Sequence, residues 1–143
     1  MLDTMTVVRS TKDVDYTELA RLLSAANLAD HSPELRKTAF DNSPVVVFCY
    51  DTEGRMIGCG RALTDGAYEA ALYDVAVIEE LRGQGLGRFI VETILEDLPG
   101  QNVIFFTAVG KEAFYEKLGC HRMNTGMARF ARPERMRQRG YID

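Results

Sequence analysis

The residues with the clearest chemical meaning form a glycine-rich loop at positions 81–88. The loop reads Leu-Arg-Gly-Gln-Gly-Leu-Gly-Arg and stands between a predicted strand and a predicted helix. The first turn of a helix presents backbone N–H groups without intrahelical acceptors, together with the positive end of the helix dipole. Because glycines let a ligand approach the backbone, a loop of this kind is suited to bind a phosphate group.

Two common phosphate-binding patterns do not fit this loop. A dinucleotide-binding fingerprint would need glycine at position 88 or 90, where Arg88 and Ile90 stand. A P-loop would need Gly-Lys followed by Ser or Thr, and the loop lacks that sequence. The pattern that remains is R-x-x-G-x-G, from Arg82 through Gly85 to Gly87.

The charges of the following helix also favour an anionic ligand. Arg88 lies in its first turn, and Glu96 and Asp97 lie in its last turn, which is the reverse of the arrangement that stabilises a free helix. An anion bound at the N-terminus would offset that cost. Glycines that served only a tight turn would leave the flanking arginines, Arg82 and Arg88, unexplained.

Metal sites and nucleophile sites are not indicated by the sequence. His31 lies between predicted helices, and His121 follows Cys120 in a predicted strand, where neighbouring side chains face opposite ways. The other two cysteines, Cys49 and Cys59, complete an odd number without metal-like spacing, and we interpret all three as thiols in a reducing compartment. Because no Ser/His or Cys/His nucleophile motif is present, we expect no covalent enzyme intermediate.

Hydrophobic periodicity predicts the elements that must position the loop. Before the loop we expect two helices and three antiparallel strands, at residues 13–26, 33–42, 45–50, 55–63 and 68–77. After it we expect a helix to residue 98, a strand, a short helix and a closing hairpin, at residues 103–108, 111–118, 120–125 and 127–131. This order predicts an α/β fold with a mixed, mostly antiparallel sheet flanked by helices. One parallel βαβ crossover would carry the loop.

Length and composition limit the class of protein. The chain has 143 residues, of which 46% are apolar and 27% charged, so we expect a single globular domain over residues 1–143. Its formal charge of −4 argues against a nucleic-acid partner and favours small cationic ones. No window approaches the ~18 apolar residues of a membrane span, and the N-terminus lacks a secretory pattern. We therefore expect a cytoplasmic protein without a membrane partner.

The C-terminal tail carries the opposite charge. Residues 127–143 contain five arginines against Glu134 and Asp143, a balance of +3. We interpret this run as a solvated helix face, with an electrostatic handle for a phosphate-bearing partner as the alternative.

Three segments follow one another in a characteristic order. They are the strand Leu72-Tyr73-Asp74-Val75-Ala76-Val77, the loop from Arg82 to Gly87, and the segment Phe114-Tyr115-Glu116-Lys117-Leu118-Gly119. The loop follows the pattern R/Q-x-x-G-x-G/A, and a helix and a strand separate it from the last segment. In this order and spacing they resemble the GCN5-related N-acetyltransferases, and the resemblance extends over nearly the whole chain.

The resemblance implies the donor, the acceptor class and the cofactor contacts. The donor would be acetyl-coenzyme A, and the acceptor a primary amine of a small molecule or a peptide. The pyrophosphate would lie on the backbone amides near residues 83–88, and the pantetheine arm would pair with the strand at residues 76–77, where the family's parallel strands splay. The cofactor-binding residues implied in this way are Val75, Ala76, Val77, Arg82, Gly83, Gln84, Gly85, Leu86, Gly87 and Arg88.

Acetyl transfer to an amine limits the residue types that can assist it. An alkyl ammonium has a pKa of about 10, so a base or a water relay must remove a proton. Asp74, inside an apolar strand, is the best acid/base candidate by position, although it could instead orient a backbone group or the substrate ammonium. Glu69 acting through water is a further alternative. The resemblance assigns the protonation of the leaving thiolate to Tyr115, and a strand bulge would aim the amides of residues 75–77 at the oxyanion.

The function that we expect is direct attack by the amine in a ternary complex. The main alternative is a non-catalytic coenzyme A-binding regulatory module, and a weaker one is a module that binds another nucleotide phosphate. The resemblance implies an acceptor pocket at residues 27–33 and 125–130, and Asp30 and the adjacent Glu34 could attract an ammonium. The identity of the acceptor and the oligomeric state, including a homodimer, stay open.

Overall fold

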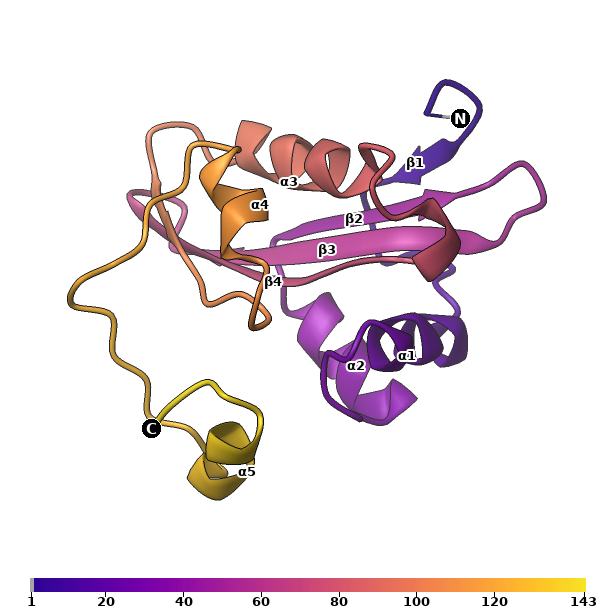
Figure 1. Cartoon of the computed structure of the whole chain (residues 1–143). Helices are drawn as coiled ribbons and strands as arrows, with labels where there is room; N and C mark the ends of the chain where they lie inside the picture. Colours follow the sequence, from indigo (N-terminus) through magenta and orange to yellow (C-terminus); the bar gives the residue numbers. More distant parts are fainter. Residues whose placement is uncertain (1) are drawn as a thin grey trace. The chain divides into compact units, whose positions relative to one another are not determined.

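The computed structural model describes residues 2–143. It contains helices and strands in a mixed order (Figure 1). In chain order they are β1 (Thr6–Val8), α1 (Tyr16–Ala25), α2 (Pro33–Asp41), β2 (Val45–Tyr50), β3 (Met56–Thr64), β4 (Glu69–Val77), the 3-10 helix η1 (Glu79–Leu81), α3 (Leu86–Glu96), β5 (Asn102–Ile104), α4 (Glu112–Glu116) and α5 (Pro133–Gln138).

The chain divides into two compact units, one ending at Phe105 and the other running from Phe106 to Asp143. The first unit holds a five-stranded sheet in the order β1-β2-β3-β4-β5. Strands β1 to β4 are antiparallel neighbours, whereas β4 and β5 are parallel and are joined through α3. Helices α1 and α2 cover one face of this sheet and α3 covers the other (Figure 1). The predicted α/β fold and its single parallel crossover are therefore confirmed.

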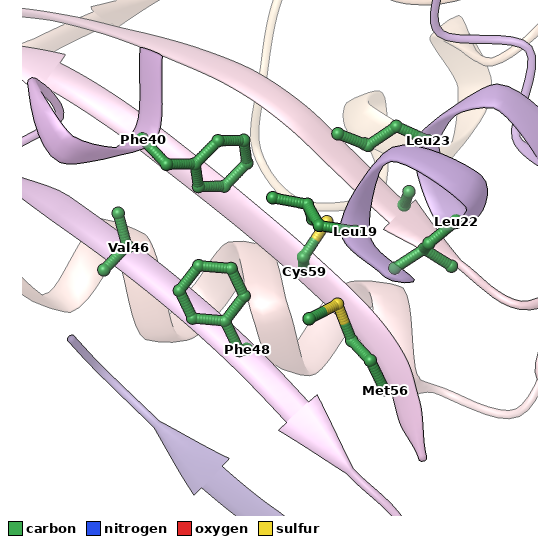
Figure 2. Packing of buried hydrophobic residues seen from close by; sticks show 9 residues of the cluster. Leu19, Leu22, Leu23, Phe40, Val46, Phe48, Met56 and Cys59 are labelled. Carbon is green, nitrogen blue, oxygen red and sulfur yellow. The ribbon is translucent and has the colours of Figure 1, made fainter. Parts of the chain in front are cut away.

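The main core lies between the sheet and the pair α1 and α2. The helices contribute apolar side chains at helical spacing, β2 contributes the alternate residues Val46 and Phe48, and β3 contributes Met56 and Cys59 (Figure 2). The members are Leu19, Leu22, Leu23, Phe40, Val46, Phe48, Met56, Cys59 and Ala76. Side-chain capping fixes where both helices begin, because Asp15 accepts from the amides of Thr17 and Glu18, and Ser32 accepts from that of Leu35.

The opposite face depends on a close approach of α3 to β3. A Cβ atom added at Gly58 would lie 2.7 Å from Ile90 Cδ1, and one added at Gly60 would lie 2.8 Å from Ile94 Cδ1. Both isoleucines are fully buried. The absence of side chains at these two positions therefore sets how closely the helix can pack on the strand.

The ends of the sheet differ from the prediction in three ways. Strand β1 was not predicted, and it pairs with β2 over only three residues. The expected strand at 103–108 is reduced to β5, and it is not covered on both faces, because Ile104 at this sheet edge is 49% exposed. The closing hairpin is absent from the described chain, since the segment 120–131 forms no strand. Most of that segment is exposed, so no buried face fixes a strand register there.

The second unit is built from short helices and aromatic contacts. The predicted helix at 111–118 is confirmed in its centre as α4, and Gly119 follows it with a φ of 88°. The Phe106 ring lies edge-on to the rings of Phe130 and Tyr141, each at a centroid distance of 5.6 Å. Part of the arginine-rich tail forms α5, in which no residue is buried, and this favours the solvated-face interpretation. Among residues 2–143, no helix is long and apolar enough to cross a membrane.

Packing of α3 on β3 predicts a cost for filling the space at Gly60. We expect Gly60→Val to lower the free energy of unfolding by about 1–3 kcal/mol, because Ile90 and Ile94 must leave their packed positions. The same change at Gly126, where the nearest atom to an added Cβ is 3.6 Å away, should stay within about 0.5 kcal/mol of the original protein. Urea unfolding of the two variants measures the difference, and equal effects would contradict this account of the packing.

Candidate functional site

A bulge in β4 shapes the centre of the candidate site. Cys59 on β3 faces Ala76, and Arg61 faces Tyr73, so β3 advances two residues while β4 advances three. The extra residue lies at Asp74, whose φ of 55° is in the left-handed region that side chains rarely adopt. A bulge of this kind changes the directions in which the following backbone groups point.

Two arginines hold the carboxylate of Asp74. Arg61 Nε donates to Oδ2 at 2.7 Å, and Arg36 Nη1 donates to Oδ1 at 3.3 Å. The side chains of Asp74 and Arg36 are only 14% and 4% exposed, so the charges are largely withdrawn from water. Such charges need partners of opposite sign, and the cluster provides them.

The guanidinium of Arg36 also reaches the segment between α1 and α2. Its Nη2 donates to the carbonyl oxygens of Leu28 and Ala29, the second at 2.9 Å. Burial lowers the pKa of Arg36, and the attraction of Asp74 opposes that effect. Arg36 Nε is buried without a hydrogen-bond partner in the part of the chain that the structure describes.

In the part of the chain that the structure describes, the end of β4 has no paired strand on the β5 side, so one backbone edge is open there. Pairing between β4 and β5 stops at Ala71 and Ile104, although β4 continues to Val77. The amide of Ile78 donates to Ile57 on β3, so the alternation of an extended chain directs the polar groups of Val77 toward the opposite edge. On that edge Arg82 Nε donates to Val77 O at 3.3 Å.

The glycine-rich loop connects the end of β4, through η1, to α3, whose N-terminus is uncapped. Gly85, with a φ of 91°, is the first flanking residue of α3, and no side chain in the described chain caps the helix. The amides of the first turn, at residues 86–88, lack intrahelical acceptors by geometry. A Cβ atom added at Gly83 or Gly85 would meet open space. Glycine is therefore favoured at both positions by the positive φ of the backbone, and not by close contact with neighbouring groups. Arg88 Nε pairs with Glu92 at 2.7 Å along the same helix.

Tyr115 lies on α4 in the second unit. Its side chain is half-buried, and its ring lies edge-on to that of Phe114 at a centroid distance of 4.9 Å. Burial, with a smaller contribution from Cys120, raises the pKa of Tyr115 to about 12. The phenol therefore keeps its proton throughout the neutral range.

The first unit brings together most of the residues proposed from sequence. Asp74, the following amides at 75–77 and the loop at 82–88 are consecutive parts of β4, η1 and the start of α3. Glu69 stands at the first residue of β4, away from the loop, where its Oε1 accepts from Asn102 at 2.9 Å. Tyr115 and residues 125–130 belong to the second unit.

Sequence reasoning missed Arg36 and Arg61. Each has a signal: Arg36 is four residues before the buried Phe40 on α2, and Arg61 interrupts an apolar strand next to the strand that contains Asp74. A charged residue on an inward-facing position predicts a charged partner, but the sequence does not identify it.

Comparisons with known proteins agree on one family. The acetyltransferase (GNAT) family model matches residues 15–120. An uncharacterized N-acetyltransferase, ycf52, of Pyropia yezoensis is 24% identical over 116 residues, covering 77% of this chain and 67% of that protein. The chloroplastic serotonin N-acetyltransferase 2 of Oryza sativa subsp. japonica is 29% identical over 119 residues, covering 79% of this chain and 60% of that protein.

Solved structures show the same fold. A protein of unknown function from methicillin-resistant Staphylococcus aureus superposes with a TM-score of 0.80 at 21% identity, covering 90% of this chain and 98% of that chain.

Proposed function

The chain belongs to the acetyltransferase (GNAT) family, whose members use acetyl-coenzyme A, and on this premise we propose that it acetylates a primary amine by direct attack in a ternary complex. Two neighbouring features carry the proposal. The N-terminus of α3 is uncapped, and it comes only a few residues after the strand β4, whose end has an open edge. We propose that residues 1–143 act as one acetyltransferase domain in the cytoplasm, although the rice relative is chloroplastic by name.

The cofactor would bind mainly through backbone groups. Amides at residues 83–88 would hold the pyrophosphate, supported by the helix dipole, because two of the three loop glycines keep the backbone uncovered. The pantetheine arm would extend along the open edge of β4 at Ala76 and Val77. Arg82, which now bonds Val77 O, marks where the arm would meet the strand. These contacts use Val75, Ala76, Val77, Arg82, Gly83, Gln84, Gly85, Leu86, Gly87 and Arg88.

The reaction would form a C–N bond and break the C–S bond of the thioester. The neutral amine attacks the carbonyl carbon, and the amides at residues 75–77, redirected by the bulge, receive the oxyanion. The intermediate expels the thiolate, which takes the hydroxyl proton of Tyr115, while water removes the proton that the amine nitrogen loses. The Tyr115 phenolate then takes a proton back from solvent, which completes the proton balance. The two guanidinium groups on Asp74 favour its orienting role over its role as the general base.

The acceptor would be a small amine or a peptide amine. The rice relative is a serotonin N-acetyltransferase by name, so aromatic ethylamines are the first acceptors to assay, followed by polyamines and peptides. Release of thiol from acetyl-coenzyme A in the presence of an amine tests the function. Binding of coenzyme A without turnover of any amine would favour the non-catalytic module.

The proposed pyrophosphate site predicts that a side chain at Gly85 abolishes cofactor binding. A valine there would stand in the open space before the first-turn amides, so the affinity for coenzyme A should fall at least about 100-fold. Gly66→Val is the matched control, because Gly66 also has a positive φ and open surroundings but lies in the turn before β4. Calorimetric titration measures both variants. Unchanged affinity in a folded Gly85→Val protein would overturn the assignment.

The proposed acid predicts the effect of Tyr115→Phe. Losing a general acid typically costs about 10²–10⁴-fold in kcat, while coenzyme A affinity should stay within about twofold. Because the pKa of Tyr115 is about 12, the phenol holds its proton below pH 11, so the loss should be uniform between pH 7 and 10. Tyr68→Phe, at a side chain that is 67% exposed, is the control and should leave kcat unchanged. A Tyr115→Phe variant within twofold of the original kcat would assign the protonation to water.

A further inference from the structure

We propose that Arg36 is a positioning residue that joins the acceptor side of the site to the cofactor strand. Its guanidinium holds the main chain at residues 28–29 and the carboxylate of Asp74 at the same time. The inference rests on the proposed acetyl transfer. It adds that Arg36 links the segment proposed to bind the acceptor to the strand proposed to bind the cofactor.

The first contact of Arg36 fixes an unusual backbone. Asn27 and Ala29 have φ values of 64° and 57°, in the left-handed region, and an alanine stays there only when its surroundings hold it. Arg36 Nη2 donates to both Leu28 O and Ala29 O, and the Arg36 side chain that makes these bonds is buried. This backbone belongs to the segment at residues 27–33, where we expect the acceptor.

The second contact fixes the bulge. Arg36 Nη1 and Arg61 Nε take different oxygens of Asp74, so the carboxylate cannot rotate without losing one of them. Arg61 is itself fixed, since its Nη1 donates to Ser43 Oγ at 3.2 Å and its Cζ lies 4.9 Å from the centroid of the Tyr73 ring. The residue after Asp74 begins the run of amides at 75–77 that we assign to the oxyanion and the pantetheine arm.

A lysine cannot make the same set of bonds. Its single ammonium has three donors on one atom, whereas the planar guanidinium reaches two carbonyls with one nitrogen and a carboxylate with another. Arg36→Lys therefore keeps the charge beside Asp74 but should release one of the two segments. A role in stability alone would lower the melting temperature without changing the reaction at temperatures where the protein is folded.

The kinetic experiment compares Arg36→Lys with Arg9→Lys. Arg9 also bonds a main-chain carbonyl, that of Thr93 at 3.3 Å, and a carboxylate, that of Asp97, but neither belongs to the proposed site. We expect Arg36→Lys to lower kcat/KM for the acceptor at least about tenfold. Coenzyme A affinity should stay within about threefold, because the loop at 83–88 that would hold the pyrophosphate stays intact and only the pantetheine contacts at 75–77 are disturbed. Arg9→Lys should leave both quantities unchanged. A value of kcat/KM within twofold in a folded Arg36→Lys protein would overturn the proposal.

A second experiment reads the link without catalysis. Asp74→Asn suits the positive φ, since asparagine tolerates that region, but it removes the charge that Arg36 binds. We expect backbone amide chemical shifts of Asp74→Asn to change at residues 28–30 as well as at 75–77, and those of Arg36→Lys to change at both places too. Changes confined to the mutated side would overturn the link. If the original protein neither binds coenzyme A nor acetylates an amine, the proposed function fails, while the chemical shifts still decide whether Arg36 couples the two segments.

Discussion

The carboxylate of Asp74, held between two guanidinium groups, is the interaction on which the candidate site depends. A charge this far from water is stable only with partners of opposite sign, and a left-handed backbone at a residue other than glycine is stable only when the surroundings compensate for it. Both conditions are met at one residue. The ion pairs hold the side chain on the α2 face, and the backbone then turns so that Val75 faces α3, where its Cγ2 would lie 3.4 Å from a Cβ at Gly60.

The two faces of the sheet are consequently coupled at this point. On one face, Phe40 packs in the core with Phe48 and also lies under the guanidinium of Arg61, at 5.6 Å from the ring centroid. On the other face, the missing side chains of Gly58 and Gly60 allow α3 to lie close to β3. Because α3 starts at the glycine-rich loop, the same packing that buries Ile90 also positions the uncapped amides beyond the end of β4. A site made of backbone groups requires a rigid arrangement of this kind, since no single side chain can adjust it.

Features that depend on neighbouring residues in the sequence were predicted, whereas features that depend on contacts between distant residues were not. The loop was identified because its glycines and arginines are adjacent in sequence, and β2 because six apolar residues adjoin a turn. Strand β1 was missed because its three residues depend on pairing with residues forty or more positions away. The hairpin at 120–131 was predicted as two short strands joined at Gly126, and in the structure the segment has no buried face to hold such strands. Asp74 was identified as unusual, but its partners come from α2 and β3, and the register that brings Arg61 beside it includes a bulge that no periodicity predicts.

The proposed proton transfer from Tyr115 to the thiolate also depends on burial, because burial changes the pKa of both groups. A phenol whose pKa is about 12 is a weak acid toward a thiolate in water, where a thiol has a pKa of about 8.5. Burial, however, raises the pKa of a thiol as well, as it does for Cys59 in this chain. A thiolate formed away from water is therefore a stronger base than one in solution, and the difference that opposes transfer from Tyr115 becomes smaller. Exclusion of water would thus support the acid role of Tyr115, in the same way that it makes the ion pairs of Asp74 necessary.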